Sequence, residues 1–250
     1  RNFSLIMPRH ISLVFPGQGS QSVGMLDDFT QDDIYSIKPA LTELPFDLID
    51  IIQNNPEDIL NKTSITQPAL LATSYLHYKK FLSLTNTLPN IIAGHSLGEY
   101  SALVAADSIK LKNAISLVHK RGLFMESSEK GSMFAILNLD LSFVIDICND
   151  VSIATGLIVS PANINSPNQI VIAGNEEAAV IAADRCKEAG AKRCIQLKVG
   201  AASHCMLMKA ASESLLAELN LIHFNELSIP IIHNYDVSIE SSSINLVDKL

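Results

Sequence analysis

The sequence predicts an α/β protein in which a smaller, ferredoxin-like subdomain is inserted into a larger domain. Three observations lead to this prediction. In the first 130 residues, short apolar runs end at turn residues and are followed by helical patterns. Residues 131–198 follow their own order of patterns, strand-helix-strand-strand-helix-strand, which is typical of a split β-α-β unit. The composition is that of a globular chain, with 48% hydrophobic and 18% charged residues among 250. We therefore place the large domain at 1–130 and 199–250 and the subdomain at 131–198.

Each predicted element of the large domain rests on a local pattern. Strands are predicted where short apolar runs stop at turn residues, as 11–15 does before the turn 16–20 and 91–93 does before Gly94. Helices are predicted where apolar residues recur at helical spacing, as in 66–81, whose first turn tolerates Pro68. The elements in order are strand 11–15, helix 66–81, strand 91–93, helices 97–106, 111–125 and 206–219, and strand 229–232.

The subdomain and the C-terminal end follow the same rules. The subdomain elements are strand 133–139, helix 141–148, strands 157–159 and 170–173, helix 176–189 and strand 193–199. At the end of the chain, Ser243 stands where a helix cap belongs, and apolar residues follow at helical spacing. The sequence stops within that pattern, so we expect the chain to be truncated at its C-terminus.

Charge, hydropathy and cysteine usage exclude several classes of protein. A net charge of −8 argues against a nucleic-acid partner, because such proteins grip the backbone with a basic surface. The apolar stretches fall short of the roughly 20 residues that span a bilayer, so we expect no membrane partner. The four cysteines form neither a CxxC pair nor a metal-binding spacing, and the N-terminus has no signal-peptide core. We therefore expect a cytoplasmic protein with reduced thiols and no structural metal.

The strongest chemical signal is the segment Gly-His-Ser-Leu-Gly at 94–98. It follows a predicted buried strand and opens a predicted helix, which is the context of the G-x-S-x-G nucleophile elbow. Small residues at both ends let the chain turn sharply and expose the hydroxyl of Ser96. The backbone N–H of Leu97 would then point at the position where an oxyanion forms. The structural alternative is a glycine turn with a capping serine.

A nucleophilic serine needs a base, and His204 is the strongest candidate among the seven histidines. It lies in a stretch of small residues that follows a predicted strand, where catalytic groups of α/β folds collect. The alternative is a histidine that caps the next helix. His95 is expected to point away from the sharp turn, and His77 and His119 are interpreted as half-buried helical residues.

Two further residues could complete an acyl-transfer site. Glycines on both sides of Gln18 would free its backbone N–H to approach a substrate as a second oxyanion donor, although an ordinary turn fits the same pattern. Arg121 falls in an apolar helical stretch, where a partly desolvated guanidinium could bind a carboxylate. Alternatively, its aliphatic stem covers apolar surface while its head reaches water.

Several motifs taken together are more specific than any one of them. In chain order they are Phe15–Gln21 with Gly24-Met25, Thr66–Leu70, Gly94–Tyr100, Arg121-Gly122, Asn163–Pro167 and Ser203-His204. The same order occurs in malonyl-CoA:acyl carrier protein transacylases, and the sequence resembles this family along nearly its whole length. The resemblance implies an α/β-hydrolase-like core that carries a ferredoxin-like subdomain.

The resemblance also implies a mechanism and a pathway, fatty acid biosynthesis. Ser96, activated by His204, would attack the thioester of malonyl-CoA and form a malonyl-serine ester. Backbone N–H groups of Leu97 and Gln18 would hold the oxyanion, and Arg121 would pair with the free carboxylate. The pantetheine thiol of acyl carrier protein would then accept the malonyl group, with no cofactor beyond the coenzyme A thioester. Two residues of the motifs are candidates for the pocket lining: Gln67 and Asn165.

Two other functions remain open. A serine hydrolase using Ser96 would usually place an acidic residue between serine and histidine in chain order, and Asp146, Asp150 and Asp184 lie in that interval. They fall inside the inserted subdomain rather than at a strand end of the core. The second alternative is a non-catalytic docking module for carrier protein.

An acidic carrier protein would need a local basic surface on this acidic chain. Four cations near the subdomain boundary could supply one: Lys187, Lys192, Arg193 and Lys198. Electrostatic steering depends on the local field rather than on the total charge, so we expect carrier protein to dock there. The alternative is an ordinary solvated helix end.

Overall fold

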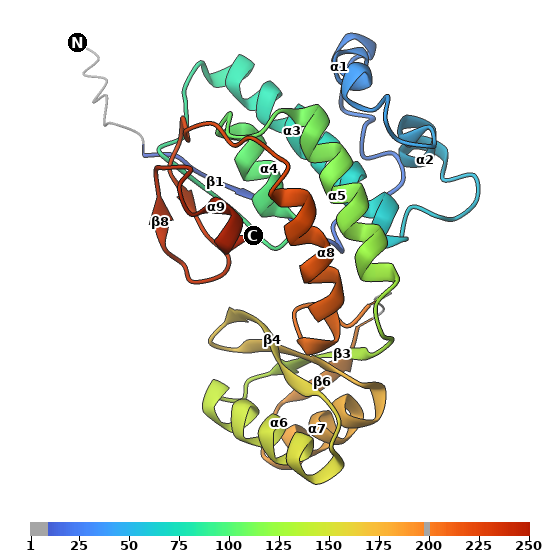
Figure 1. Ribbon diagram of the computed structural model, residues 1–250, viewed down its shortest axis with the longest axis vertical. Coiled ribbons are helices and arrows are strands. Elements are labelled where there is room, and N and C mark those ends of the chain that lie inside the picture. The colour runs from blue at the N-terminus through green and yellow to red at the C-terminus, as the bar shows by residue number, and fades with distance from the viewer. Residues whose placement is uncertain (1–9, 198–200) are drawn as a thin grey trace, which may run out of the picture. The chain divides into compact units, whose positions relative to one another are not determined.

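The computed structural model describes residues 10–197 and 201–250 and divides the chain into two compact units (Figure 1). The first unit comprises the described residues up to Gly122 together with Leu216–Leu250, and the second comprises Leu123–Leu215. The second unit thus extends beyond the expected range 131–198. The reason lies after the last strand, where Ala202 and Leu207 pack against the sheet of the second unit.

The first unit is built on a mainly parallel sheet. Strands β1 (Ser12–Phe15), β2 (Ile91–Gly94) and β7 (Ile231–Ile232) are parallel, β8 (Ile239–Glu240) is antiparallel to β7, and the order is β1-β2-β7-β8. This arrangement is an α/β fold with a parallel sheet, as expected. Because β1 and β2 are parallel and in register, the turns that follow them emerge at the same edge of the sheet.

Helices cover this sheet, and α4 packs on β1 and β2 while α3 packs on α4 (Figure 1). The helical elements are α1 (Gln31–Ile37), the 3₁₀ turn Lys38–Ala40, α2 (Leu48–Asn54), α3 (Thr63–Thr85), α4 (Gly98–Ala105), α5 (Leu111–Glu126), α8 (Lys209–Leu219) and α9 (Leu246–Lys249). Helices α5 and α8 cross the boundaries between the units along the chain. Every residue of α4 is buried, so this helix forms the centre of the unit.

Several sequence-based boundaries need correction. Two short helices, α1 and α2, were not expected, although Thr30 and Asp33 form a capping box and Asp47 caps α2. Ser243 does not cap the last helix: its hydroxyl donates to Glu226 at 2.7 Å, and Asn245 is the N-cap residue. The predicted helix 206–219 begins as the 3₁₀ turn Met206–Met208 before α8.

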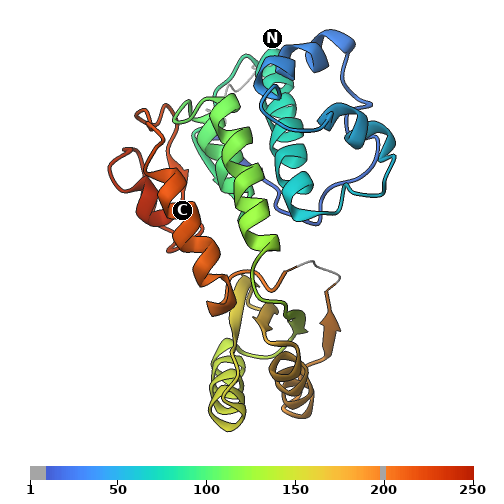
Figure 2. The same ribbon diagram turned by 45° about the vertical axis from the view of Figure 1, so that its right-hand side comes forward.

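The second unit has the expected order of elements. They are β3 (Ser132–Leu137), α6 (Leu141–Thr155), β4 (Val159–Ser166), β5 (Gln169–Gly174), α7 (Glu176–Glu188) and β6 (Arg193–Gln196). All strand pairs are antiparallel in the order β4-β5-β3-β6, and α6 packs against α7 (Figures 1 and 2). Strand β4 extends well past its predicted end, because pairing with β5 supports polar residues that lack an apolar pattern.

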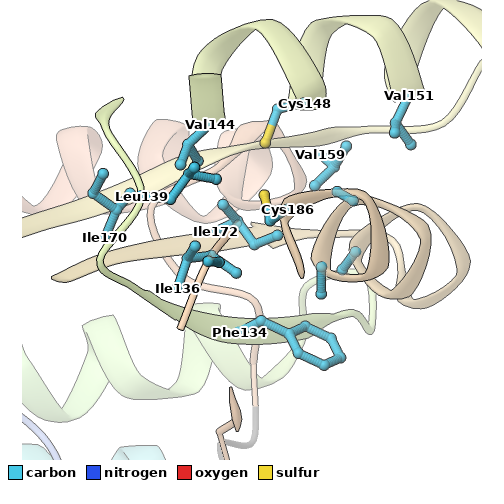
Figure 3. Close-up of a cluster of buried hydrophobic side chains, with 14 of the residues drawn as sticks. Phe134, Ile136, Leu139, Val144, Cys148, Val151, Val159, Ile170, Ile172 and Cys186 are labelled. Carbon is cyan, nitrogen blue, oxygen red and sulfur yellow. The ribbon is translucent and has the colours of Figure 1, made fainter. Parts of the chain in front are cut away.

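Alternate residues of these strands face two different clusters. Phe134, Ile136, Ile170 and Ile172 point toward α6 and α7, as Figure 3 shows for the buried side chains around them. Their neighbours along the strands pack with Ala202 and Leu207.

Two of the cysteines lie in the helix-covered cluster (Figure 3). Burial raises the pKa of the Cys148 and Cys186 thiols to about 12, so both stay protonated and unreactive at neutral pH.

Among the residues that the structure describes, no helix has both the length and the apolar character that crossing a membrane requires. The same residues contain no cluster of three or more histidine, cysteine, aspartate or glutamate side chains with the geometry of a metal site.

Candidate active site

The turn between β2 and α4 has the geometry of a nucleophile elbow. Ser96 has a φ of 51°, a left-handed conformation that is uncommon for residues other than glycine and that persists only where the surroundings enforce it. A Cβ atom on Gly94 would overlap the backbone of Gly98, and one on Gly98 would overlap the carbonyl oxygen of Phe15. Only glycine therefore fits at both ends of this turn, as the sequence pattern predicts.

The turn after β1 lies beside the elbow. The backbone N–H of His95 donates to the carbonyl oxygen of Phe15 at 3.1 Å, which extends the pairing of β1 and β2 into the two turns. Gln18 is exposed in the first of these turns, and its side chain donates to the Thr63 hydroxyl at 3.3 Å. Leu97 is buried at the N-cap of α4, where the positive end of the helix dipole favours developing negative charge.

A guanidinium group lies next to the serine hydroxyl. Arg121 on α5 donates from Nη2 to Ser96 Oγ at 3.2 Å and from Nη1 to Gln67 Oε1 at 2.9 Å. Its Cζ lies 5.5 Å from the ring centroid of Tyr100, so the ring stabilises the cation further. The head group of Arg121 thus lies at Ser96 and is only partly exposed.

Gly122, the residue after Arg121, explains how α5 comes so close to α3. A Cβ atom on Gly122 would overlap the Cα of Ser64 on α3 and would lie 2.7 Å from the Ser64 backbone nitrogen. Glycine at this position thus lets α5 approach the helix that carries Gln67. The two residues of the Arg-Gly pair act together, one binding Ser96 and the other allowing that contact.

We expect Gly122→Ala to lower both the stability of the protein and its activity. In an open helix this substitution stabilises by up to about 1 kcal/mol, but overpacking against Ser64 costs about 1–3 kcal/mol. Thermal unfolding should therefore shift to lower temperature, and activity should fall because Arg121 moves away from Ser96. Asn113→Ala, on the exposed face of the same helix, is the matched control. Unchanged stability and activity in Gly122→Ala would contradict the packing argument.

Three residues behind the elbow were not predicted from the sequence. Glu99, in the first turn of α4, contacts His233 Nδ1 with Oε1 at 2.5 Å and accepts the Asn234 backbone N–H with Oε2 at 3.1 Å. The Asn234 side chain in turn accepts the backbone N–H of Ser96 with Oδ1 at 2.9 Å. His233 and Asn234 follow strand β7, and a polar pair at that strand end is the signal that could have revealed them.

His204 belongs to the second unit and is exposed in a tight turn with a φ of 60°. This turn is anchored because Ala202 is fully buried beneath the sheet and its carbonyl oxygen accepts the Cys205 thiol at 3.2 Å. The short segment that carries His204 is therefore held in place by contacts within the second unit.

The remaining predicted site residues also lie in the second unit. Asn165 is exposed on β4, and its amide lies 3.4 Å from Gln169 Oε1 across the hairpin. Lys187 is exposed at the end of α7, and Lys192 and Arg193 are exposed at the start of β6. Lys198, as well as the predicted strand end at 199, lies outside the described residues.

Comparison with known proteins gives a consistent result. The family model for the acyl transferase domain matches residues 12–245. Malonyl CoA-acyl carrier protein transacylase of Escherichia coli strain K12 is 44% identical over 247 residues, which cover 96% of this chain and 79% of that protein. The corresponding protein of Staphylococcus aureus strain MRSA252 is 36% identical over 237 residues, covering 92% and 75%.

Solved structures agree with this comparison. A malonyl-transacylase in complex with a type II polyketide acyl carrier protein matches with a TM-score of 0.91 and 43% identity, over 96% of this chain and 79% of that one. The malonyl CoA-acyl carrier protein transacylase of Coxiella burnetii matches with a TM-score of 0.93 and 36% identity, over 98% and 79%. This chain, which carries the elbow, the Arg-Gly pair and the β1 turn, therefore belongs to the acyl transferase domain family.

Proposed function

We propose that this chain transfers the malonyl group of malonyl-CoA to the pantetheine thiol of acyl carrier protein through an ester on Ser96. The observation that carries the proposal is the 3.2 Å contact between Arg121 Nη2 and Ser96 Oγ. A cation at the nucleophile suits an acyl group that ends in a carboxylate. The relatives described above are malonyl CoA-acyl carrier protein transacylases, which supports the same two substrates. We propose that the reaction serves fatty acid biosynthesis.

In the first half of the reaction, His204 acts as the general base. Its imidazole takes the hydroxyl proton while Ser96 Oγ bonds to the thioester carbon. The backbone N–H groups of Leu97 and Gln18 stabilise the resulting oxyanion. The carbon–sulfur bond then breaks, and the imidazolium returns the proton to the departing sulfur, so that coenzyme A leaves as a thiol.

The second half repeats this chemistry with a different thiol. His204 takes the proton of the pantetheine thiol as its sulfur attacks the ester carbon, and the proton returns to Ser96 Oγ when the carbon–oxygen bond breaks. One acyl-enzyme serves two thiols in turn, so ping-pong kinetics follow. This sequence needs a nucleophile, a base and oxyanion donors, and the coenzyme A thioester is a substrate, so we propose that no further cofactor takes part.

Arg121 selects the acyl group in this scheme. Its guanidinium would pair with the malonyl carboxylate, while the fully buried side chain of Gln67 accepts the hydrogen bond from Nη1. An acyl group without the carboxylate would leave a partly desolvated cation without its partner, which costs binding free energy. Asn165 is the second residue that we propose for the lining of the substrate pocket.

The hydrolase alternative has weaker support. Asp146, Asp150 and Asp184 are exposed on helices α6 and α7 rather than placed at a strand end. The deciding experiment incubates the protein with labelled malonyl-CoA and acyl carrier protein. Our proposal expects label on the carrier protein, whereas rapid release of free malonate without labelled carrier would favour the hydrolase. If Ser96→Ala leaves the measured activity unchanged, the chain is a docking module instead.

We propose that acyl carrier protein docks on the basic patch formed by Lys187, Lys192 and Arg193. Reversing two of these charges, in Lys192→Glu with Arg193→Glu, should raise the KM for carrier protein several-fold at low salt, and the effect should shrink as salt screens it. Lys79→Glu with Lys110→Glu, which makes the same charge change at exposed positions of the first unit, is the control. An unchanged KM at low salt would show that the patch does not guide the carrier.

We further propose that the first unit is an α/β-hydrolase-like core and that the second is a ferredoxin-like subdomain. The strand order β4-β5-β3-β6, the antiparallel pairing and the helices α6 and α7 on one face support the second assignment. We place the reaction in the cytoplasm, since the four cysteines are free thiols, as expected in a reducing compartment.

A further inference from the structure

A buried hydrogen-bonded chain supports the elbow from behind, and it consists of Glu99, His233 and Asn234. Glu99 is 3% exposed and His233 is 1% exposed, so the contact between them is almost completely shielded from water. Asn234, in contrast, is exposed. The chain therefore runs from the interior of the first unit to the surface at the nucleophile.

The carboxyl group of Glu99 is the acceptor for two partners. Its Oε1 lies 2.5 Å from His233 Nδ1, and its Oε2 accepts the Asn234 backbone N–H at 3.1 Å. Burial raises the pKa of Glu99, and the hydrogen bonds from His233 and Asn234 act against that rise. The Asn234 backbone N–H is a donor, and the His233 tautomer that carries its proton on Nδ1 donates to the same carboxyl group.

Among the described residues, the carboxyl group of Glu99 is the one side-chain partner of His233. Its Nε2 is buried and has no hydrogen-bond partner among the described residues. The contact of Nδ1 with Oε1 places this buried ring where it holds Glu99 in position. His233 thus holds the Glu99 carboxylate in the position where it accepts the Asn234 backbone N–H.

Asn234 links this pair to the strained residue of the elbow. Its backbone is held by Glu99, and its side-chain Oδ1 accepts the backbone N–H of Ser96 at 2.9 Å. Ser96 has a φ of 51°, a conformation that needs external support. The hydrogen bond from Ser96 to Asn234 supplies such support at the peptide group next to the reacting hydroxyl.

We infer that Asn234 is a positioning residue for the nucleophile and that the buried Glu99–His233 pair sets its place. The inference deepens the proposed function and rests on it, because it takes Ser96 to be the group that becomes acylated. Loss of the Asn234 side chain would let the elbow relax and would misalign Ser96 Oγ. Small misplacements of a reacting group cost large factors in rate.

The test compares Asn234→Ala and Asn234→Asp with the matched control Ser238→Ala. Ser238 lies on the same loop, and its hydroxyl contacts Asp236 and Lys249 rather than Glu99 or Ser96. The readouts are the burst rate of Ser96 acylation by p-nitrophenyl acetate, a small uncharged ester, and kcat and KM for malonyl-CoA. The uncharged ester separates positioning from the extra negative charge of the aspartate. Thermal unfolding reports whether each variant folds normally.

We expect Asn234→Ala to slow acylation and to lower kcat by about 10- to 100-fold, with an unchanged KM and an unchanged unfolding temperature. Asn234→Asp keeps an acceptor oxygen and should recover most of the burst rate with the uncharged ester. Ser238→Ala should behave like the unaltered protein. Glu99→Gln should slow the burst as well, and adding it to Asn234→Ala should cause little further loss, because both act through one contact.

Failure of this inference is distinguishable from failure of the proposed function. If the unaltered protein is not acylated at Ser96, the proposed function fails. If it is acylated and Asn234→Ala reacts as fast, the positioning role is overturned while the function stands. Equal losses in the alanine and aspartate variants would also overturn it, since the acceptor atom would then be irrelevant.

Discussion

Replacing His204 with alanine should lower kcat/KM for malonyl transfer by about 10²- to 10⁴-fold, the contribution that a positioned general base makes. Both halves of the proposed reaction pass a proton through this imidazole, so both should slow. The measurement is the rate of malonyl loading of Ser96 and of its transfer to carrier protein, followed separately in single-turnover reactions. The exposed side chain of His204 belongs to neither core cluster, so the variant should fold normally.

His223→Ala is the matched control, because His223 is also exposed and takes no part in the reaction that we propose. It should keep full activity. A His204→Ala variant that loads malonyl at the normal rate would show that another group serves as base. We expect the unfolding temperature of His204→Ala to be unchanged. If it falls together with malonyl loading, the loss of loading reflects damage to the fold, which contradicts that expectation.

Arg121→Ala should lower kcat/KM for malonyl-CoA by roughly 100-fold, which corresponds to losing one partner of a partly buried charge pair. Acetyl-CoA has no carboxylate to pair with the guanidinium, so its use should fall much less or should improve. The informative quantity is the ratio of kcat/KM for the two donors, because a general loss of folding or of Ser96 geometry would affect both equally.

Two variants sharpen this comparison. Lys120→Ala removes the neighbouring cation, which binds Glu218 at 2.7 Å instead of the site, and should leave the donor ratio unchanged. Arg121→Lys keeps the charge but loses the planar fork that reaches Gln67 and Ser96 together, so its ratio should be intermediate. Equal losses for malonyl-CoA and acetyl-CoA in Arg121→Ala would mean that the arginine is structural.

Those parts of the fold and site that depend on local sequence could be predicted. The elbow could be predicted because its glycines, its preceding strand and its following helix lie within fifteen residues. The order of elements in the second unit followed from apolar periodicity in the same way. The length of β4 did not follow from apolar periodicity, because the end of that strand is polar and is stabilised by pairing with β5.

Features that depend on packing between distant segments could not be predicted from spacing. Whether the Arg121 head reaches water or Ser96 is decided by the close approach of α5 to α3, which Gly122 allows. The Glu99–His233 pair joins residues 134 positions apart, so no local pattern shows that these two side chains meet. The helices α1 and α2 are short and depend on caps, so apolar periodicity gave too weak a signal.

Mass spectrometry of the intact protein after exposure to malonyl-CoA, followed by peptide mapping, tests the central claim most directly. Our account predicts a mass increase of one malonyl group located on Ser96, lost when holo acyl carrier protein is added and absent in Ser96→Ala. A malonyl group on another residue, or an adduct that persists in Ser96→Ala, would contradict it.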